Sequence, residues 1–182
     1  MKMYYIIHGL TEWNKNGFAQ GHRDIPLCDE GRAQARETAK VLADKHIDLC
    51  IASPLARARE TAEIVLEGRD VPIIFDNRLV ERNFGMYEGT PHTLQQPDEW
   101  RDRFWSIDED MRYADIEPMS SVVKRLYEFL DEIKETYRDK SVLIASHGGL
   151  SAAVKYYIAG EPVSRNYRFD IIKNCEIIEG EI

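Results

Sequence analysis

The sequence predicts an α/β fold, a three-layer sandwich in which helices cover both faces of a mainly parallel sheet. Short apolar runs rich in β-branched and aromatic residues alternate with segments whose apolar residues have helical spacing. Strands separated by helices favour right-handed crossovers, which place parallel strands in one sheet. No repeat, low-complexity tract or long linker interrupts this pattern. We therefore expect a single domain over residues 1–182.

The first part of the chain predicts three strands and two helices. In order, these are a strand over 3–7, a helix over 29–45, a strand over 48–52, a helix over 53–68 and a strand over 71–75. Asp29 is the expected cap of the first helix. Ser53 is the expected cap of the second, with Pro54 at its first helical position and Gly68 at its end.

The second part begins with an irregular stretch over 78–118 that is aromatic and charged, where we expect loops and short helices. An amphipathic helix is predicted over 119–137, with a buried face formed by Val122, Val123, Leu126, Phe129, Leu130 and Ile133. A fourth strand over 141–146 precedes a helix that runs to about residue 158. Two final apolar stretches, 169–172 and 175–178, are expected to form edge strands.

Charge and composition exclude several classes of protein. The chain has 24 Lys and Arg against 32 Asp and Glu, a net charge of −8, which argues against nucleic acid or a membrane surface as partner. No apolar run approaches the roughly 20 residues that span a bilayer, and the first apolar stretch is too short for a signal peptide. Three widely spaced cysteines favour reduced thiols and a cytoplasmic location. The sequence indicates no particular oligomeric state.

Four polar residues follow the predicted strands. His8 and His147 end the first and fourth strands, Arg57 lies in the first turn after the second, and Glu81 lies shortly after the third. Each residue alone has an ordinary structural explanation, such as a hydrogen bond or a surface ion pair. Ligands of open α/β sheets bind beyond the carboxyl ends of the strands, so together the four predict a site. A Gly follows each of the two histidines and allows close backbone approach.

Other chemistries have weaker support in the sequence. Ser146 or Ser53 could serve a serine hydrolase, but no GxSxG motif is present. The five histidines lack the spacing of metal ligands, and neither a P-loop nor GxGxxG occurs. Cys50 at the end of a strand is more typical of a buried apolar residue than of a nucleophile.

Several ordered segments carry a family resemblance. They are HGLTEWN (8–14), QGHRDIPLCDEGRAQA (20–35), SPLARARETA (53–62), LVERNFGMYEG (79–89) and SHGG (146–149). Together they resemble the histidine phosphatase superfamily, which has the phosphoglycerate mutase-like fold. The resemblance covers the chain to about residue 158.

The resemblance implies a role for each candidate. His8 matches the nucleophile that forms a phosphohistidine, Arg57 and His147 match the phosphate pocket, and Glu81 matches the proton donor. The residues expected to bind substrate are Asn14, Gly21, Gly148 and Arg82. No metal and no cofactor are implied. The expected partner is a small phosphorylated metabolite. Because phosphoryl transfer depends on positioning and charge neutralisation, these residue types suit the reaction.

The chain departs from the family pattern beside the nucleophile. The family normally has RHG, whereas this sequence reads IIHG, with Ile7 in the place of the arginine and Leu10 where an acid or amide is usual. The family's Gly-Glu-Ser corresponds to 116–118, which keeps only the acid, and its Trp-Glu-Gly corresponds to 87–89. Removing one preorganised donor from a transition state costs about 10²–10³ in rate.

Two interpretations of Ile7 remain open. In one, the chain is a working phosphatase of reduced or altered activity, with replacement charge from Lys15, Arg23, Arg59 or Arg82. In the other, it binds phosphorylated ligands with little turnover. The first interpretation, a working phosphatase, is favoured because His8, Arg57, Glu81 and His147 are all present.

The irregular region over 78–118 is the expected lid or substrate region. Its aromatic residues are Phe84, Tyr87, Trp100, Phe104 and Trp105, although at least two of the last three are expected to pack on helices instead. Mutases of the family carry longer insertions, so this compact chain favours a phosphomonoester hydrolase over phosphoglycerate mutase-type transfer.

Overall fold

The computed structural model describes residues 1–91, 105–107, 115–164 and 167–182. Its sheet has the strand order β3-β2-β4-β1-β5. The strands are β1 (Lys2–Ile7), β2 (Leu49–Ala52), β3 (Ile73–Phe75), β4 (Ser141–Ser146) and β5 (Ile177–Glu181). The first four are parallel and β5 pairs antiparallel with β1. The predicted α/β fold with a mainly parallel sheet is confirmed.

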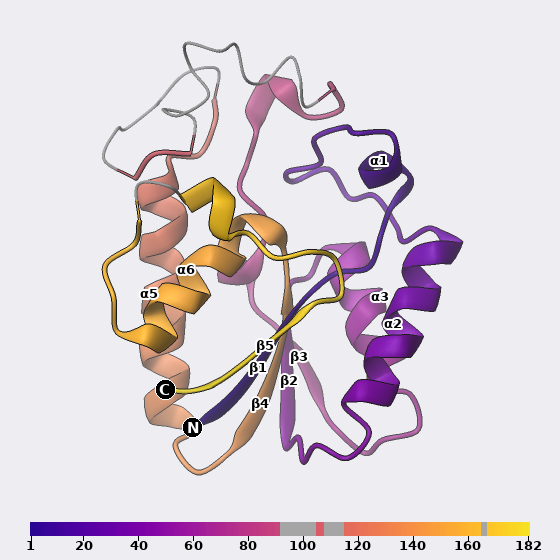
Figure 1. The fold of residues 1–182 in the computed structure, drawn as a ribbon, viewed down its shortest axis with the longest axis vertical. Helices are drawn as coiled ribbons and strands as arrows, with labels where there is room; N and C mark the ends of the chain where they lie inside the picture. The colour runs from indigo at the N-terminus through magenta and orange to yellow at the C-terminus, as the bar shows by residue number, and fades with distance from the viewer. Residues whose placement is uncertain (92–104, 108–114, 165–166) are drawn as a thin grey trace.

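Helices cover both faces of this sheet, as Figure 1 shows. On one face lie α2 (Asp29–Val41) and α3 (Ala56–Val65), and on the other lie α5 (Met119–Thr136) and α6 (Gly148–Ala159). The short elements are α1 (Glu12–Lys15) and the 3-10 helices η1 (Asn77–Leu79), η2 (Gly85–Tyr87) and η4 (Tyr167–Asp170). Among the described residues, none of the helices is long and apolar enough to cross a membrane.

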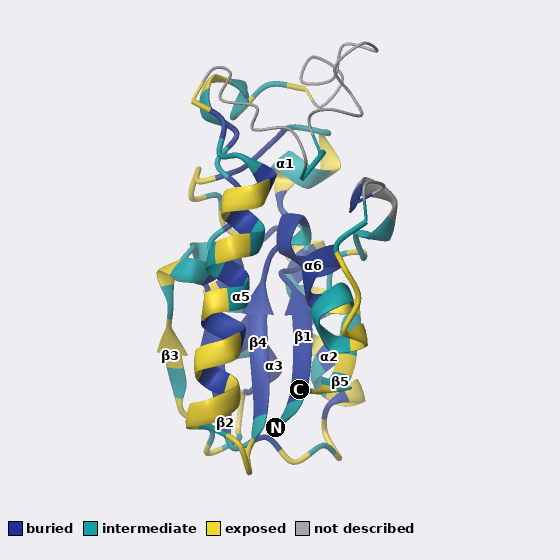
Figure 2. Cartoon of the chain, turned by 90° about the vertical axis from the view of Figure 1, so that its left-hand side faces the viewer, coloured by how far each residue is buried: buried dark blue, intermediate teal, exposed yellow. Residues whose placement is uncertain are grey.

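The alternating direction of the side chains along β1 explains the two hydrophobic cores that lie on either face of the sheet. Met3, Tyr5 and Ile7 point into the core shared with α5 and α6, whereas Tyr4 and Ile6 point into the core shared with α2 and α3. Successive side chains of a strand face opposite sides of a sheet, so a continuous apolar run is typical of a strand covered on both faces. Figure 2 shows β1 and β4 buried over almost their whole length.

Helix α5 confirms the predicted amphipathic segment. Every residue of its predicted apolar face is buried except Val123, which is partly buried. By contrast, the predictions that Asp29 and Ser53 cap the helices α2 and α3 were wrong. The cap of α2 is Cys28 and the cap of α3 is Leu55, neither with a side-chain bond. The carboxylate of Asp24 instead accepts from the backbone N–H of Ala56 at 2.6 Å, so a distant residue satisfies the start of α3.

The prediction of an edge strand over 169–172 was wrong. Residues 169 and 170 are the end of η4, and 171–172 follow it without regular structure. At the start of η4 the Tyr167 hydroxyl donates to the Gly149 carbonyl at 2.6 Å. Ile171 and Ile172, which follow η4, lie against the start of α6: Ile171 is next to Gly148, and the Ile172 N–H donates to the Ser151 hydroxyl at 3.2 Å rather than to a strand. The last strand lies at 177–181 instead of 175–178, after Cys175, whose φ of 59° turns the chain.

The irregular region was predicted to contain loops and short helices, and its described part contains η1 and η2. Trp105 is partly buried and stacks on Tyr167, with ring centroids 6.5 Å apart. Trp100 and Phe104 lie outside the described residues. A lid over 78–118 therefore stays a prediction.

Candidate active site

Two neighbouring strands bring the two predicted site histidines together. Ile7 at the end of β1 pairs with Ser146 at the end of β4, so the residues that follow lie side by side. The backbone N–H of His8 donates to the Ser146 carbonyl at 3.0 Å. The rings of His8 and His147 meet edge to face with centroids 5.2 Å apart. Sheet register thus builds the centre of the site.

The imidazole of His8 is held in one tautomer. Its Nδ1 lies 2.7 Å from the Gly9 carbonyl, which can only accept a hydrogen bond, so Nδ1 carries the proton. The Nε2 lone pair accepts from Nε of Arg57 at 3.2 Å. Burial, reinforced by the charge of Arg57, lowers the pKa of His8 to about 3. His8 is therefore a neutral imidazole whose Nε2 is a potential nucleophile.

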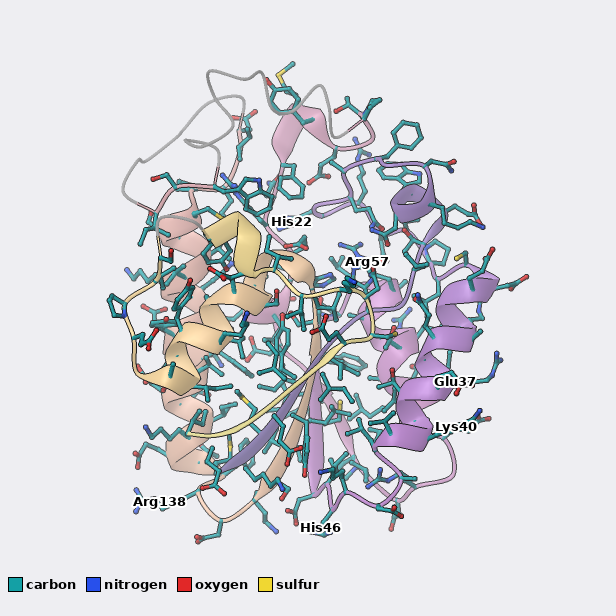
Figure 3. All side chains as sticks on the ribbon, viewed as in Figure 1. His22, Glu37, Lys40, His46, Arg57 and Arg138 are labelled. Carbon is teal, nitrogen blue, oxygen red and sulfur yellow. The ribbon has the colours of Figure 1, made fainter. Side chains whose placement is uncertain are left out.

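Arg57 enters the site from the first turn of α3 and is fully buried. Its Nη1 donates to the Arg23 carbonyl at 2.8 Å and its Nη2 donates to the Gly21 carbonyl at 2.7 Å. Burial lowers the pKa of Arg57 to about 10, which leaves the group cationic at neutral pH. Figure 3 shows Arg57 above the strand ends in the interior, whereas Arg138 projects from the periphery.

His147 lies next to His8 at the start of α6. Its Nε2 lies 2.8 Å from the Ser53 hydroxyl, and its carbonyl accepts from the Tyr5 hydroxyl at 2.6 Å. Burial, together with the nearby charge of Arg57, lowers its pKa well below the usual value. Nδ1 of His147 is buried and has no hydrogen-bond partner among the described residues. Buried polar atoms are normally satisfied, so an unsatisfied one indicates a place for a bound group.

Glu81 is 8% exposed and its carboxylate meets the N-terminus of α6. One oxygen accepts from the Gly149 N–H at 3.1 Å, and the other accepts from the Arg82 N–H at 2.8 Å. A Cβ on Gly149 would lie only 2.2 Å from Oε1 of Glu81. Glycine is therefore needed at 149 for this close approach.

A cavity of about 240 Å³ joins these groups. Six of the predicted site residues line it, namely His8, Asn14, Gly21, Arg57, Glu81 and Gly148. Its apolar lining consists of Ile7, Phe18, Phe84, Trp105, Ile171 and Ile172. His147 is not one of the lining residues, but its ring contacts the ring of His8, which is. Within the described parts of the chain, Arg57 is the only Lys or Arg that lines the cavity.

The proposed replacement cations lie elsewhere. Lys15 donates to Glu30 at 2.7 Å, the Arg23 side chain is 68% exposed, and Arg59 is exposed. Arg82, also predicted to bind substrate, is buried outside the cavity lining. Its Nε donates to the Glu117 carbonyl at 2.7 Å. In this structure, none of these four side chains lines the cavity, whereas Ile7 does.

Sequence reasoning missed three polar contributors to the site. Asn174 lines the cavity, and its Nδ2 donates to the His8 carbonyl at 2.7 Å. Gln20 also lines the cavity. Ser53, expected as a cap, instead contacts His147. No local pattern marks Asn174 as a site residue, whereas Gln20 begins the segment over 20–35 and lies next to Gly21, which was a usable signal. The position of Ser53 at the end of β2, level with the other strand ends, was a usable signal.

Potential metal ligands gather at one place among the described residues, formed by Glu12, Cys28 and Glu30. Nζ of Lys15 lies 3.6 Å from Glu12 and 2.7 Å from Glu30. A protein cation thus already occupies the space between the carboxylates. None of these residues lines the cavity.

Comparison with known proteins agrees with this geometry. The sequence matches the histidine phosphatase superfamily (branch 1) over residues 3–182. It is 35% identical over 158 residues to the uncharacterized phosphatase PhoE of Bacillus subtilis, covering 85% of this chain and 76% of the relative. It is 30% identical over 179 residues to the probable phosphoglycerate mutase GpmB of Escherichia coli, covering 97% and 83%.

A solved structure shares the fold. YhfR of Bacillus stearothermophilus superposes with a TM-score of 0.86 at 30% identity, covering 98% of this chain and 89% of the other. The chain therefore belongs to the histidine phosphatase superfamily (branch 1). It is an enzyme of the histidine phosphatase and phosphoglycerate mutase family, with a phosphatase or phosphotransferase role.

Proposed function

We propose that the protein is a metal-independent phosphomonoester hydrolase that works through a phosphohistidine on His8. The observation that carries this proposal is the fixed tautomer of His8. Its Nδ1–H is bonded to Gly9 and its Nε2 lone pair faces Arg57 at the cavity. A neutral imidazole held in this way is a nucleophile at neutral pH.

The first step transfers the phosphoryl group to the protein. As Arg57 shifts its Nε–H hydrogen bond from His8 to a phosphoryl oxygen, the freed lone pair on Nε2 of His8 attacks phosphorus in line with the ester oxygen, so an N–P bond forms as the P–O bond breaks. Arg57, which lines the cavity, stabilises the charge on the phosphoryl oxygens. His147 would add a bond from its buried Nδ1, which has no partner among the described residues and lies on a ring that meets the ring of His8. Protonated Glu81 gives its proton to the departing alkoxide. The leaving alcohol then departs from the cavity.

The second step restores the enzyme. The Glu81 carboxylate takes a proton from water, the water oxygen attacks phosphorus, and the N–P bond breaks to release phosphate and neutral His8. Asn14, Gly21 and Gly148 would bind the substrate at the cavity wall. We infer a small phosphorylated metabolite as substrate and a cytoplasmic location. Arg82 would act only indirectly, because its position is outside the lining.

Ile7 would lower or alter the activity. An isoleucine offers no hydrogen bond to a phosphoryl oxygen, so Arg57 would carry the charge neutralisation with fewer partners. A binding protein with little turnover is the alternative outcome, and the similarity to GpmB makes mutase-type transfer a lesser one.

The test is hydrolysis of a chromogenic phosphomonoester in the presence of a chelator. We expect the native chain to be active, His8→Ala to be inactive, and Ile7→Arg to be faster by up to about 10²-fold, the scale of one regained donor. Ile7→Leu is the matched control for repacking and is expected to match the native rate. If none of these proteins turns over while inorganic phosphate still binds, the proposed hydrolase activity is contradicted and the binding alternative replaces it.

A further inference from the structure

Arg125 on α5 has a guanidinium whose donors are completely used by the protein. Its Nη1 donates to the carbonyls of Arg78 and Val80 at 2.6 and 2.8 Å. Its Nη2 donates to the Glu81 carbonyl at 3.2 Å and to Oε2 of Glu117 at 3.1 Å. Its Nε donates to Oε1 of Glu117 at 2.8 Å. These five bonds equal the number of N–H groups that a guanidinium has.

Three of these acceptors belong to the segment that carries the proton donor. The carbonyls of 78, 80 and 81 lie on the chain that leads into Glu81, so one rigid fork fixes the path of this segment. The Glu81 carbonyl is additionally bonded to Nε2 of His22 at 2.9 Å. The planar fork of arginine defines the direction of every bond, which a lysine cannot do.

Glu117 holds the backbone on the C-terminal side of Glu81, at Asn83. Its carboxylate accepts from the Asn83 N–H at 3.2 Å, and its own N–H donates to the Asn83 carbonyl at 2.9 Å. The side chains of Arg125 and Glu117 are only 17% and 16% exposed. The charged pair therefore braces the chain both before and after Glu81, and its burial protects it from screening.

We propose that Arg125, braced by Glu117, is a positioning residue that holds the Glu81 carboxyl in the orientation needed to protonate the leaving group. Arg125 does not line the cavity, and with all of its donors used it has none left for a phosphate. The inference rests on the proposed function. Small misplacements of a catalytic group cost up to about 10²-fold in rate.

Two phosphate esters whose leaving groups differ in their need for a proton distinguish a positioning role of Arg125 from a purely structural one. Phenyl phosphate releases a basic phenolate that needs a proton, whereas 2,4-dinitrophenyl phosphate releases a stabilised anion that does not. We compare kcat/KM for both esters in the native chain, Arg125→Met and Arg125→Lys. Both assays on one preparation share the same folded fraction, so their ratio is independent of partial unfolding.

We expect Arg125→Met to lower kcat/KM for phenyl phosphate at least about 10-fold, while the value for the dinitrophenyl ester changes less than about threefold. Arg125→Lys, which keeps the charge but loses the fork, should fall between. Lys124→Met, at a neighbouring position of α5 with a side chain 76% exposed, is the matched control and should leave both values unchanged.

Equal losses for both esters in both Arg125 variants would overturn the inference, because a purely structural role affects the two esters alike. No loss for phenyl phosphate would overturn it as well. If Arg125→Met does not fold, the ratio in Arg125→Lys decides. A native chain that hydrolyses neither ester contradicts the proposed function itself, which is a separate outcome.

Discussion

At the scale of single residues, the site combines buried neutral histidines with one buried cation. His8 and His147 are 4% and 0% exposed, and the pKa of each is lowered mainly by burial. Their neutrality suits the proposed chemistry, since a protonated His8 has no lone pair to attack with. It also couples folding to pH, because the same groups regain an ordinary pKa in the unfolded chain.

This coupling predicts that the protein loses stability in acid. Between pH 6.5 and about 3 the unfolded chain takes up a proton at His8 while the folded chain does not. The free energy of unfolding therefore falls as the pH is lowered, by up to about 1.4 kcal/mol per pH unit for each such histidine. Denaturant titrations between about pH 4 and about pH 7 measure this dependence. The free energy of unfolding should fall less steeply with decreasing pH in His8→Asn than in the native chain.

The control for this titration is His46→Asn. The side chain of His46 is 79% exposed and lies at the far end of the molecule from the site (Figure 3). His46 contacts Asp48 at 3.3 Å in a surface pair, and such pairs contribute little, so replacing His46 should change the slope much less than replacing His8. Identical slopes in the native chain and His8→Asn would show that His8 is not held neutral by the fold.

At the scale of elements, the start of α6 explains why two consecutive glycines have different roles. A Cβ at Gly149 would collide with the Glu81 carboxylate at 2.2 Å, whereas a Cβ at Gly148 would meet Ile171 and Ile7 at the ordinary distances of 3.5 and 3.8 Å. The carboxylate also accepts the Gly149 N–H at 3.1 Å. The start of α6 and the Glu81 carboxylate are therefore fitted to each other.

We expect Gly149→Ala to lower phosphatase activity at least about 10-fold and stability by about 1–3 kcal/mol, because Glu81 must move from the helix terminus. Gly148→Ala should change stability by less than about 1 kcal/mol, since its methyl group fits and alanine is the better helix former. Thermal unfolding and steady-state assays check both. Similar losses in the two variants would contradict the assigned close approach.

Local pattern predicted the elements well and the contacts between them poorly. The strand ends located His8, His147 and Arg57 correctly relative to the sheet, because the carboxyl ends of parallel strands share one edge. The cap of α3 was missed because Asp24, a residue remote in sequence, supplies it. The η4 segment was read as a strand because periodicity cannot distinguish packing on α6 from pairing in a sheet.

At the scale of the whole molecule, two cores hold the sheet between its helical layers. Phe129 on α5 is fully buried in one core, with the Arg78 guanidinium 5.2 Å from its ring centroid. Phe129→Ala should lower the free energy of unfolding by about 3–5 kcal/mol through lost burial and a cavity. Glu128→Ala, with a side chain 61% exposed, should change it by less than about 0.5 kcal/mol. Chemical denaturation measures both, and equal effects would contradict the packing of α5.

The net charge of −8 sets the electrostatic problem of the whole molecule. An acidic protein that handles a phosphate dianion has to concentrate positive charge locally, and here the described cavity lining has Arg57 alone. The sequence predicted that Ile7 stands where the family has an arginine. It did not show that Lys15, Arg23 and Arg82 contact partners from distant segments, or that Arg59 is exposed, so none of the four lines the cavity.

The central claim is that Nε2 of His8 carries the phosphoryl group during turnover. The direct measurement is to quench the enzyme in alkali while it turns over a phosphate-labelled ester, since phosphohistidine survives alkali and is lost in acid, and to map the labelled peptide. The account predicts label on His8 in the native chain and none in His8→Asn. Turnover with His8 unlabelled, or label at another residue, would contradict it.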